Sequence, residues 1–102
     1  TVADLLRFLD AQLGDAPPGL ADAMRATHEP RASRGALSVG LGWMSLPIKE
    51  LERRVVWHDG GTGGFRSVAG FVEGGETQVV VLSSSARAVD RLGLEIVKEL
   101  AR

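Results

Sequence analysis

The chain has 102 residues, a formal net charge of −1 and no cysteine. The length allows one small domain, the balanced charge argues against a nucleic-acid surface or a polybasic membrane face, and the absence of cysteine excludes disulfides and thiolate metal sites. No apolar run approaches the ~20 residues of a spanning helix, and the first residues have neither the basic region nor the cleavage pattern of a signal peptide.

Two helices are predicted at the start of the chain. Apolar residues recur at helical spacing over residues 2–13, Thr1 and Asp4 form an N-terminal capping signal, and Gly14 is a natural stop. A linker with two prolines, residues 15–19, leads to a short helix over residues 20–27. The polar stretch from Glu29 to Gly35 is expected to be a loop, and His28 beside it is expected to be a loop residue without a catalytic role.

Four strands are predicted next, over residues 37–44, 54–58, 65–72 and 77–83. A loop with Pro47 and a charged, solvated turn, residues 49–54, separate the first two, and residues 73–76 form a hairpin connection. Three serines, 83–85, are interpreted as N-cap candidates for a final helix over residues 86–101 and not as nucleophiles. The apolar face of that helix comprises Val89, Leu92, Gly93, Ile96, Val97 and Leu100.

These elements predict an α+β fold of the α/β-sandwich type, with an antiparallel sheet of about four strands flanked by helices. The stretches 68–72 and 79–82 do not alternate apolar and polar residues, so both sheet faces require cover. The final helix can cover one face, whereas the two short N-terminal helices cannot seal the other alone. We therefore expect the second face to pack against material outside these residues. Trp43 and Trp57 are expected to be packing residues, with pocket lining as the alternative.

The strongest functional signal is the run from Trp57 to Phe65, where an apolar strand leads into four glycines within five residues. Glycine costs backbone entropy in a strand, and it is accepted where a ligand or another backbone must come close. Two other interpretations stay open: a simple tight turn, or a phosphate-binding loop. The second is weak, because neither G-x-G-x-x-G nor G-x-x-x-x-G-K-[ST] is present.

This run resembles the third motif of the serine β-lactamase and penicillin-binding protein superfamily, with the closest likeness to its class C β-lactamase-related and esterase branch. The matching positions are His58, Asp59, Gly60 and Gly61, followed by Thr62 to Phe65. Thr27–Arg31, Leu41–Trp43 and Val81–Ser83 resemble segments that surround the motif in that family. The likeness spans all 102 residues, and it implies the C-terminal portion of the β-lactamase/transpeptidase-like fold.

The other two motifs of that family are absent. Its nucleophile lies in Ser-x-x-Lys, but Leu46 and Glu95 stand three residues before the only lysines, Lys49 and Lys98. Tyr-x-Asn is impossible, since the chain has neither tyrosine nor asparagine. Both motifs normally precede this region, and Thr1 is not an initiator methionine. We therefore expect a truncated segment that supplies no nucleophile and is inactive alone.

The resemblance implies roles for the motif residues. The acyl portion of a substrate would lie along the strand edge formed by His58, Asp59, Gly60, Gly61 and Thr62. The N–H of Gly61 would be one oxyanion-hole donor, Gly60 would leave room for ligand and nucleophile helix, and His58 would replace a cationic lysine. Histidine titrates near neutrality and Asp59 adds negative charge, so esters or peptides are favoured over β-lactams. Ser84 stands where relatives often carry asparagine.

The predicted function is thus the C-terminal part of a serine hydrolase that acts by acyl transfer on a small acyl substrate. We expect no cofactor, no metal and no nucleic-acid partner. The expected partner is the missing N-terminal part of the same protein, and the resemblance implies a periplasmic or secreted location. The alternative is a non-catalytic α+β interaction module that associates through its apolar sheet face.

Overall fold

A computed structural model describes all of residues 1–102, and it shows three helices and one antiparallel sheet of six strands in the order β1-β2-β3-β4-β5-β6. The α+β class is therefore as predicted. The helices are α1 (Val2–Gln12), α2 (Pro18–His28) and α3 (Asp90–Ala101), and a 3₁₀ turn spans Lys49–Leu51. The strands are β1 (Ala32–Arg34), β2 (Leu37–Val39), β3 (Met44–Ile48), β4 (Arg53–Thr62), β5 (Phe65–Val72) and β6 (Gln78–Ser83).

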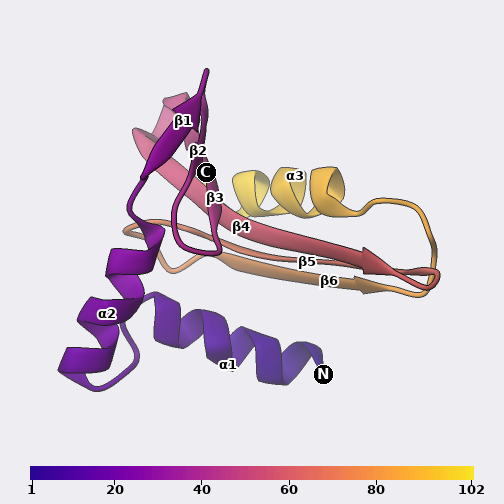
Figure 1. Ribbon diagram of the computed structural model, residues 1–102, viewed down its shortest axis with the longest axis horizontal. Coiled ribbons are helices and arrows are strands. Elements are labelled where there is room, and N and C mark those ends of the chain that lie inside the picture. Colours follow the sequence, from indigo (N-terminus) through magenta and orange to yellow (C-terminus); the bar gives the residue numbers. More distant parts are fainter.

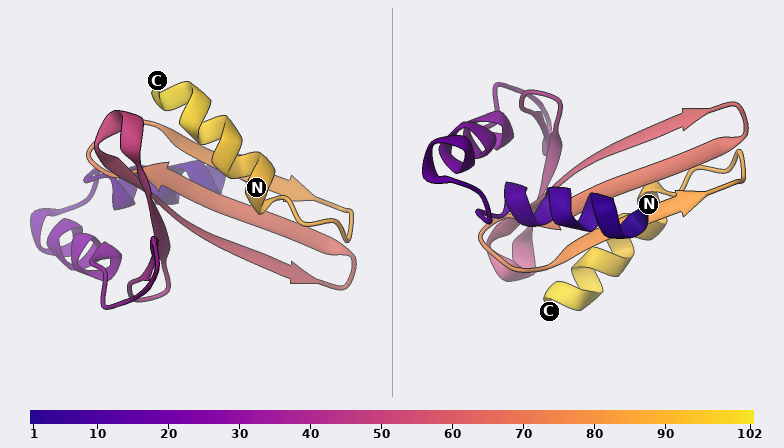
Figure 2. Two further views of the ribbon diagram at one scale, coloured as in Figure 1. Left: turned by 90° about the horizontal axis from the view of Figure 1, so that it is seen from above. Right: turned by 90° about the horizontal axis from the view of Figure 1, so that it is seen from below.

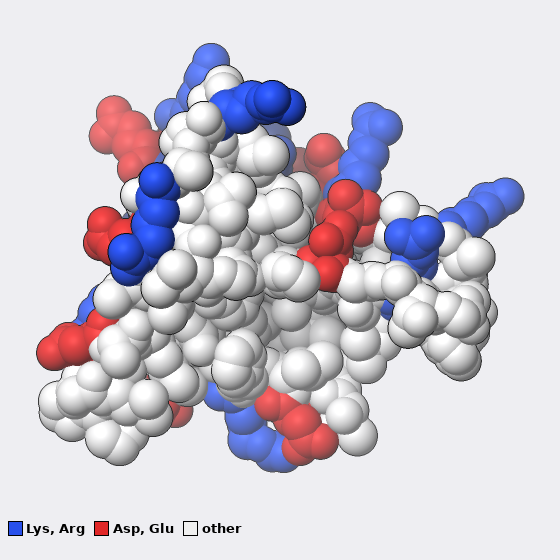
Figure 3. Space-filling model, viewed as in Figure 1, with Lys and Arg blue, Asp and Glu red and all other residues white.

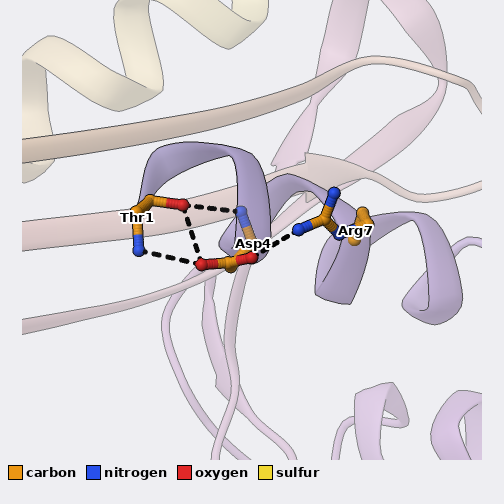
Figure 4. Close-up of polar contacts among 3 residues, drawn as sticks. All are labelled: Thr1, Asp4 and Arg7. Carbon is orange, nitrogen blue, oxygen red and sulfur yellow. Dashed lines mark hydrogen bonds and ion pairs between the residues drawn. The ribbon is translucent and has the colours of Figure 1, made fainter.

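Helix α1 begins with the capping signal that the sequence predicts. The Thr1 hydroxyl oxygen accepts a hydrogen bond from the Asp4 N–H at 3.2 Å, and the hydroxyl donates to the Asp4 carboxylate at 2.8 Å (Figure 4). Arg7 pairs with the same carboxylate from the next turn. The hydrogen bond from Thr1 is the largest of several effects that lower the pKa of Asp4, so the first turn carries a stable negative charge where the helix dipole favours it.

The sheet separates two apolar layers, with α3 over one face and α1 over the other (Figure 1). On the α3 face, a cluster around Val55, Trp57, Val68 and Val97 is buried. On the α1 face, a smaller cluster contains Leu9, Trp43, Val56 and Phe71. Both tryptophans are packing residues, as expected. Figure 2 shows the two helices on opposite sides of the three long strands, with α2 beyond one end of the sheet.

The predicted strand over residues 37–44 is wrong as a single element. It divides into β2 and β3, which meet only at Ser38↔Ser45 and Val39↔Met44. Gly40 and Gly42 lie in the turn between them, and Gly42 has a positive φ of 79°. Residues 32–34, expected in a loop, pair with β2 as the short strand β1.

Two further predictions near the sheet are wrong. Pro47 lies in β3 opposite Arg54 instead of in a loop, and this is tolerated because β2 does not extend alongside it. The three serines do not cap α3, which starts at Asp90 after Val89 without a side-chain cap. Instead, Ser83 and Ser85 accept hydrogen bonds from the N–H groups of Ser85 and Arg87 within the connection.

His28 is the last residue of α2 and is buried, so its expected position in a loop is also wrong. One ring nitrogen, Nε2, lies 2.7 Å from the Gln12 side-chain oxygen, and the ring packs against Trp43 and Phe71. Because Nε2 must donate to that oxygen, the other nitrogen has no proton in the neutral ring. The histidine therefore links α1, α2 and the core of the α1 face.

Burial is the main cause that lowers the pKa of His28 below its ordinary value of 6.5, and the nearby charges of Glu73, Arg25, Arg54 and Glu29 act in both directions. The unfolded chain then binds this proton more readily than the folded chain. We expect the contribution of His28 to the free energy of unfolding to be constant above pH 6.5 and to fall as the pH drops below that value. Urea titrations of wild type and His28→Gln from pH 7.5 to 5 measure the effect. Equal slopes in both proteins would contradict it.

Candidate functional site

Strand β4 extends past its neighbour β3, and this overhang forms the candidate site. The last pair between β3 and β4 is Met44↔Trp57, whereas β4 continues to pair with β5 as far as Thr62↔Phe65. Residues 58–62 therefore have a strand partner on one side only. These are the residues of the glycine motif, so the structure places the whole predicted site on one open strand edge.

The register decides which backbone groups face the open edge. The Arg54 carbonyl accepts from the Glu73 N–H, and the Val72 N–H donates to the Thr77 carbonyl on the other side of β5, just beyond the β5–β6 ladder. With one-to-one pairing along β4 and β5, alternation directs the peptide groups of His58 and Gly60 toward β5. The N–H groups of Asp59 and Gly61 point away from β5, and no other backbone hydrogen bond engages them.

Successive side chains of β4 point to opposite faces of the sheet, so the side chains of the motif do not all lie together. His58 is opposite Ala69 and Gly60 opposite Ser67, on the face covered by α1, whereas Asp59 is opposite Val68, which contacts α3. The Asp59 carboxylate and the His58 imidazole thus lie on opposite faces of the sheet. Neither takes part in any of the five ion pairs of the chain.

The glycine-rich run is a strand end followed by a two-residue turn. Gly63 and Gly64 have φ values of 54° and 83°, as the hairpin turn between Thr62 and Phe65 requires. Gly60 and Gly61 do not have positive φ, so their backbone is open to any residue. Phosphate-binding glycine loops join a strand to a helix, and this one joins two antiparallel strands.

An apolar groove of about 600 Å³ lies beside the open edge on the α1 face. Its wall includes three strongly exposed apolar side chains: Phe8 (46%), Leu41 (56%) and Leu82 (48%). Its other lining residues include Leu5, Trp43, His58, Gly60, Ser67 and Ala69. Helix α1 thus covers the core of this face near Val56 and Phe71, but it leaves the part next to His58 and Gly60 open.

Charge is dispersed over the molecule. In Figure 3 the acidic and basic side chains lie around the periphery, and no extended patch of either sign occupies the visible face. No group of three or more histidine, aspartate or glutamate side chains could hold a metal ion. None of the three helices has the length and apolar character needed to cross a membrane.

Comparison of the sequence with known protein families and with curated proteins finds no match.

Arg66 is the site residue that the sequence prediction missed. It lies opposite Gly61 and its side chain fills the space next to that glycine. A signal was available, because a two-residue turn at Gly63-Gly64 fixes the pairs Thr62↔Phe65 and Gly61↔Arg66 directly. Phe8 and Leu82, which wall the groove, come from elements distant in sequence and had no comparable signal.

The open edge makes a specific prediction about amide exchange. We expect the N–H groups of Asp59 and Gly61 to exchange rapidly with solvent, because they have no strand partner, while those of His58 and Gly60 are protected by β5. Hydrogen–deuterium exchange followed by ¹H–¹⁵N spectra of the 102-residue chain measures this. Protection of Gly61 equal to that of Gly60 would show that the edge is occupied.

Proposed function

We propose that the chain is the C-terminal part of a serine hydrolase of the β-lactamase and penicillin-binding protein type, and that the edge of β4 binds the acyl portion of its substrate. The observation that carries the proposal is the overhang of β4: a glycine-rich edge with outward N–H groups at Asp59 and Gly61, next to a groove that His58 lines. An extended acyl group can add to such an edge as a further strand.

In this proposal the N–H of Gly61 donates to the oxygen that becomes negative when the substrate carbonyl is attacked. One donor of this kind contributes typically ~3–4 kcal/mol of transition-state stabilisation. His58 lies on the groove side of the same strand end, where it polarises the site or holds the substrate. Serine attack forms an acyl-enzyme, the leaving group departs, and water releases the acyl group.

The serine itself is supplied by a segment outside this chain. Neither Ser-x-x-Lys nor Tyr-x-Asn is present. Because Gly60 has no side chain, it leaves room for a helix from another segment to pack against this strand. The groove next to Gly60 exposes Phe8, Leu41 and Leu82, and these side chains favour an apolar helix as its occupant. We therefore propose that the nucleophile-bearing helix seats in this groove, with its serine near the N–H of Gly61.

This division of the active site predicts that the 102-residue chain hydrolyses neither nitrocefin nor p-nitrophenyl esters. The reason is that an oxyanion donor without a nucleophile stabilises no covalent intermediate. Absorbance assays with pure protein measure it, and His58→Ala serves as the control for contaminating activity. Turnover by the wild type that is lost in His58→Ala would place the nucleophile within this chain and overturn the proposal.

The second candidate function is a non-catalytic module that associates through apolar surface. It is favoured by the exposed stripe of Leu92, Ile96 and Leu100 along α3, in addition to the groove on the opposite face. The predicted apolar face of this helix is thus only partly buried, since Gly93 and Val97 alone are fully covered. Light scattering that shows concentration-dependent assembly of the pure chain would favour this function.

A further inference from the structure

Arg66 and Gly61 share one space on the α3 face of the β4–β5 hairpin. A Cβ atom added to Gly61 would lie 2.6 Å from Arg66 Cδ and 2.7 Å from both Nε and Nη1. Real Cβ atoms do not come so close to other heavy atoms, so the shaft and guanidinium of Arg66 occupy the place of a side chain at position 61. Gly60 differs, because its nearest neighbour would be Ser67 Oγ at 3.3 Å.

The backbone conformation gives no other reason for glycine at position 61. Its φ is not in the left-handed region, unlike those of Gly63 and Gly64 in the turn. Any residue can adopt the extended conformation of a strand, and glycine weakens it. The missing side chain at position 61 therefore leaves the space in which the end of the Arg66 side chain lies.

Arg66 also reaches the connection between β6 and α3. Its Nε–H donates to the Ala86 carbonyl oxygen at 3.1 Å. Apart from this bond, the side-chain hydrogen bonds of residues 84–89 are local: the hydroxyl oxygens of Ser83 and Ser85 accept from the backbone N–H groups two residues on. Arg66 forms no ion pair with an acidic side chain, so its guanidinium is not drawn away from this position.

We propose that Arg66 is a positioning residue that clamps the Gly61 peptide and ties it to the β6–α3 connection. The Cδ end of its side chain lies against Gly61. Its Nε–H donates a hydrogen bond to the Ala86 carbonyl oxygen, which holds the guanidinium there. The peptide at position 61 pairs with β5 on one side and has no strand partner on its outer edge, so the Arg66 side chain adds a second restraint to that of the ladder. The role in catalysis rests on the proposed function, through the Gly61 N–H, whereas the clamp itself does not.

The clamp is tested by ¹⁵N relaxation of the 102-residue chain. In the wild type we expect backbone order parameters of about 0.85 at Gly61 and Ala86. In Arg66→Ala we expect lower values at both, with the larger fall at Ala86, because β5 still pairs with Gly61. Arg34→Ala, which removes another exposed arginine whose side chain forms no hydrogen bond or ion pair, should change neither. A folded Arg66→Ala protein in which Gly61 and Ala86 remain as rigid as in the wild type would overturn the proposal.

Two more variants separate the parts of the clamp. Arg66→Met keeps a shaft against Gly61 but lacks Nε–H, so it should loosen Ala86 and leave Gly61 rigid. Gly61→Ala should displace Arg66 and loosen Ala86 as much as Arg66→Ala does, and the double variant Gly61→Ala/Arg66→Ala should add nothing. Additive effects at Ala86 would show that the two residues act independently. These measurements use no substrate, so they test the Arg66 contact even if the hydrolase proposal fails.

Discussion

Phe71→Ala is expected to destabilise the chain by about 3–5 kcal/mol, the usual cost of removing a buried phenylalanine. Phe71 is 1% exposed and lies at the centre of the α1-face cluster. Its ring lies 5.6 Å from that of Trp43 in an edge-to-face arrangement and 4.8 Å from the His28 ring. Domains of this size are stable by roughly 5–15 kcal/mol in total, so the variant should be largely unfolded in mild urea. Denaturant titration followed by tryptophan fluorescence measures it.

The matched control is Phe65→Ala. Phe65 is the first residue of the same strand, β5, and is 62% exposed. Its loss should therefore change the free energy of unfolding by no more than ~0.5 kcal/mol. A cost at Phe65 equal to that at Phe71 would mean that the α1-face core is not the main packing unit on that side of the sheet.

Gly40→Ala should cost about 1–3 kcal/mol, the typical penalty for overpacking, and it should disturb the groove as well. An added Cβ at Gly40 would lie 2.3 Å from the Thr27 carbonyl oxygen and 3.0 Å from that of Glu29. These are backbone atoms, so no side chain can turn aside. The same turn is fixed by the Leu41 N–H, which donates to Thr27 at 2.8 Å, and therefore Leu41 and Trp43 should move. Thermal unfolding measures the loss of stability, and tryptophan fluorescence, to which Trp43 and Trp57 both contribute, measures the movement.

Gly19→Ala is the control for this substitution. Nothing lies within 4 Å of a Cβ at Gly19, and the residue is in α2 with ordinary φ. The same methyl group there should leave stability unchanged or raise it slightly, because alanine favours helix. If Gly40→Ala were as stable as Gly19→Ala, the end of α2 and the turn before β3 would not be in the close contact described above.

The long elements could be predicted from periodicity and caps. Helix α1 follows its leucines and its Thr1–Asp4 signal to within one residue, and β5 has the predicted bounds. Helix α2 begins at Pro18, two residues before its predicted start, because proline fits the first turn of a helix. The predictions failed at short elements such as β1 and β2, whose pairing depends on a partner strand more than on their own residues.

The candidate site could be predicted as a set of residues but not as an arrangement. The motif from His58 to Thr62 does lie on one strand end. That it is an open edge depends on where β3 begins, at Met44, which follows the turn with Gly40 and Gly42 outside the motif. The separation of His58 and Asp59 onto opposite faces follows from strand alternation once β4 is known to continue to Thr62. The groove depends on α1, and no local pattern in the sequence gives that contact.

The most direct test of the central claim is to read the coding sequence that precedes Thr1. The proposed function predicts an in-frame Ser-x-x-Lys followed by Tyr-x-Asn, which would supply the helix for the groove and the nucleophile for the Gly61 N–H. A start codon directly before Thr1, with neither motif, would contradict the hydrolase proposal. The open edge of β4 and the exposed groove would then belong to an interaction module.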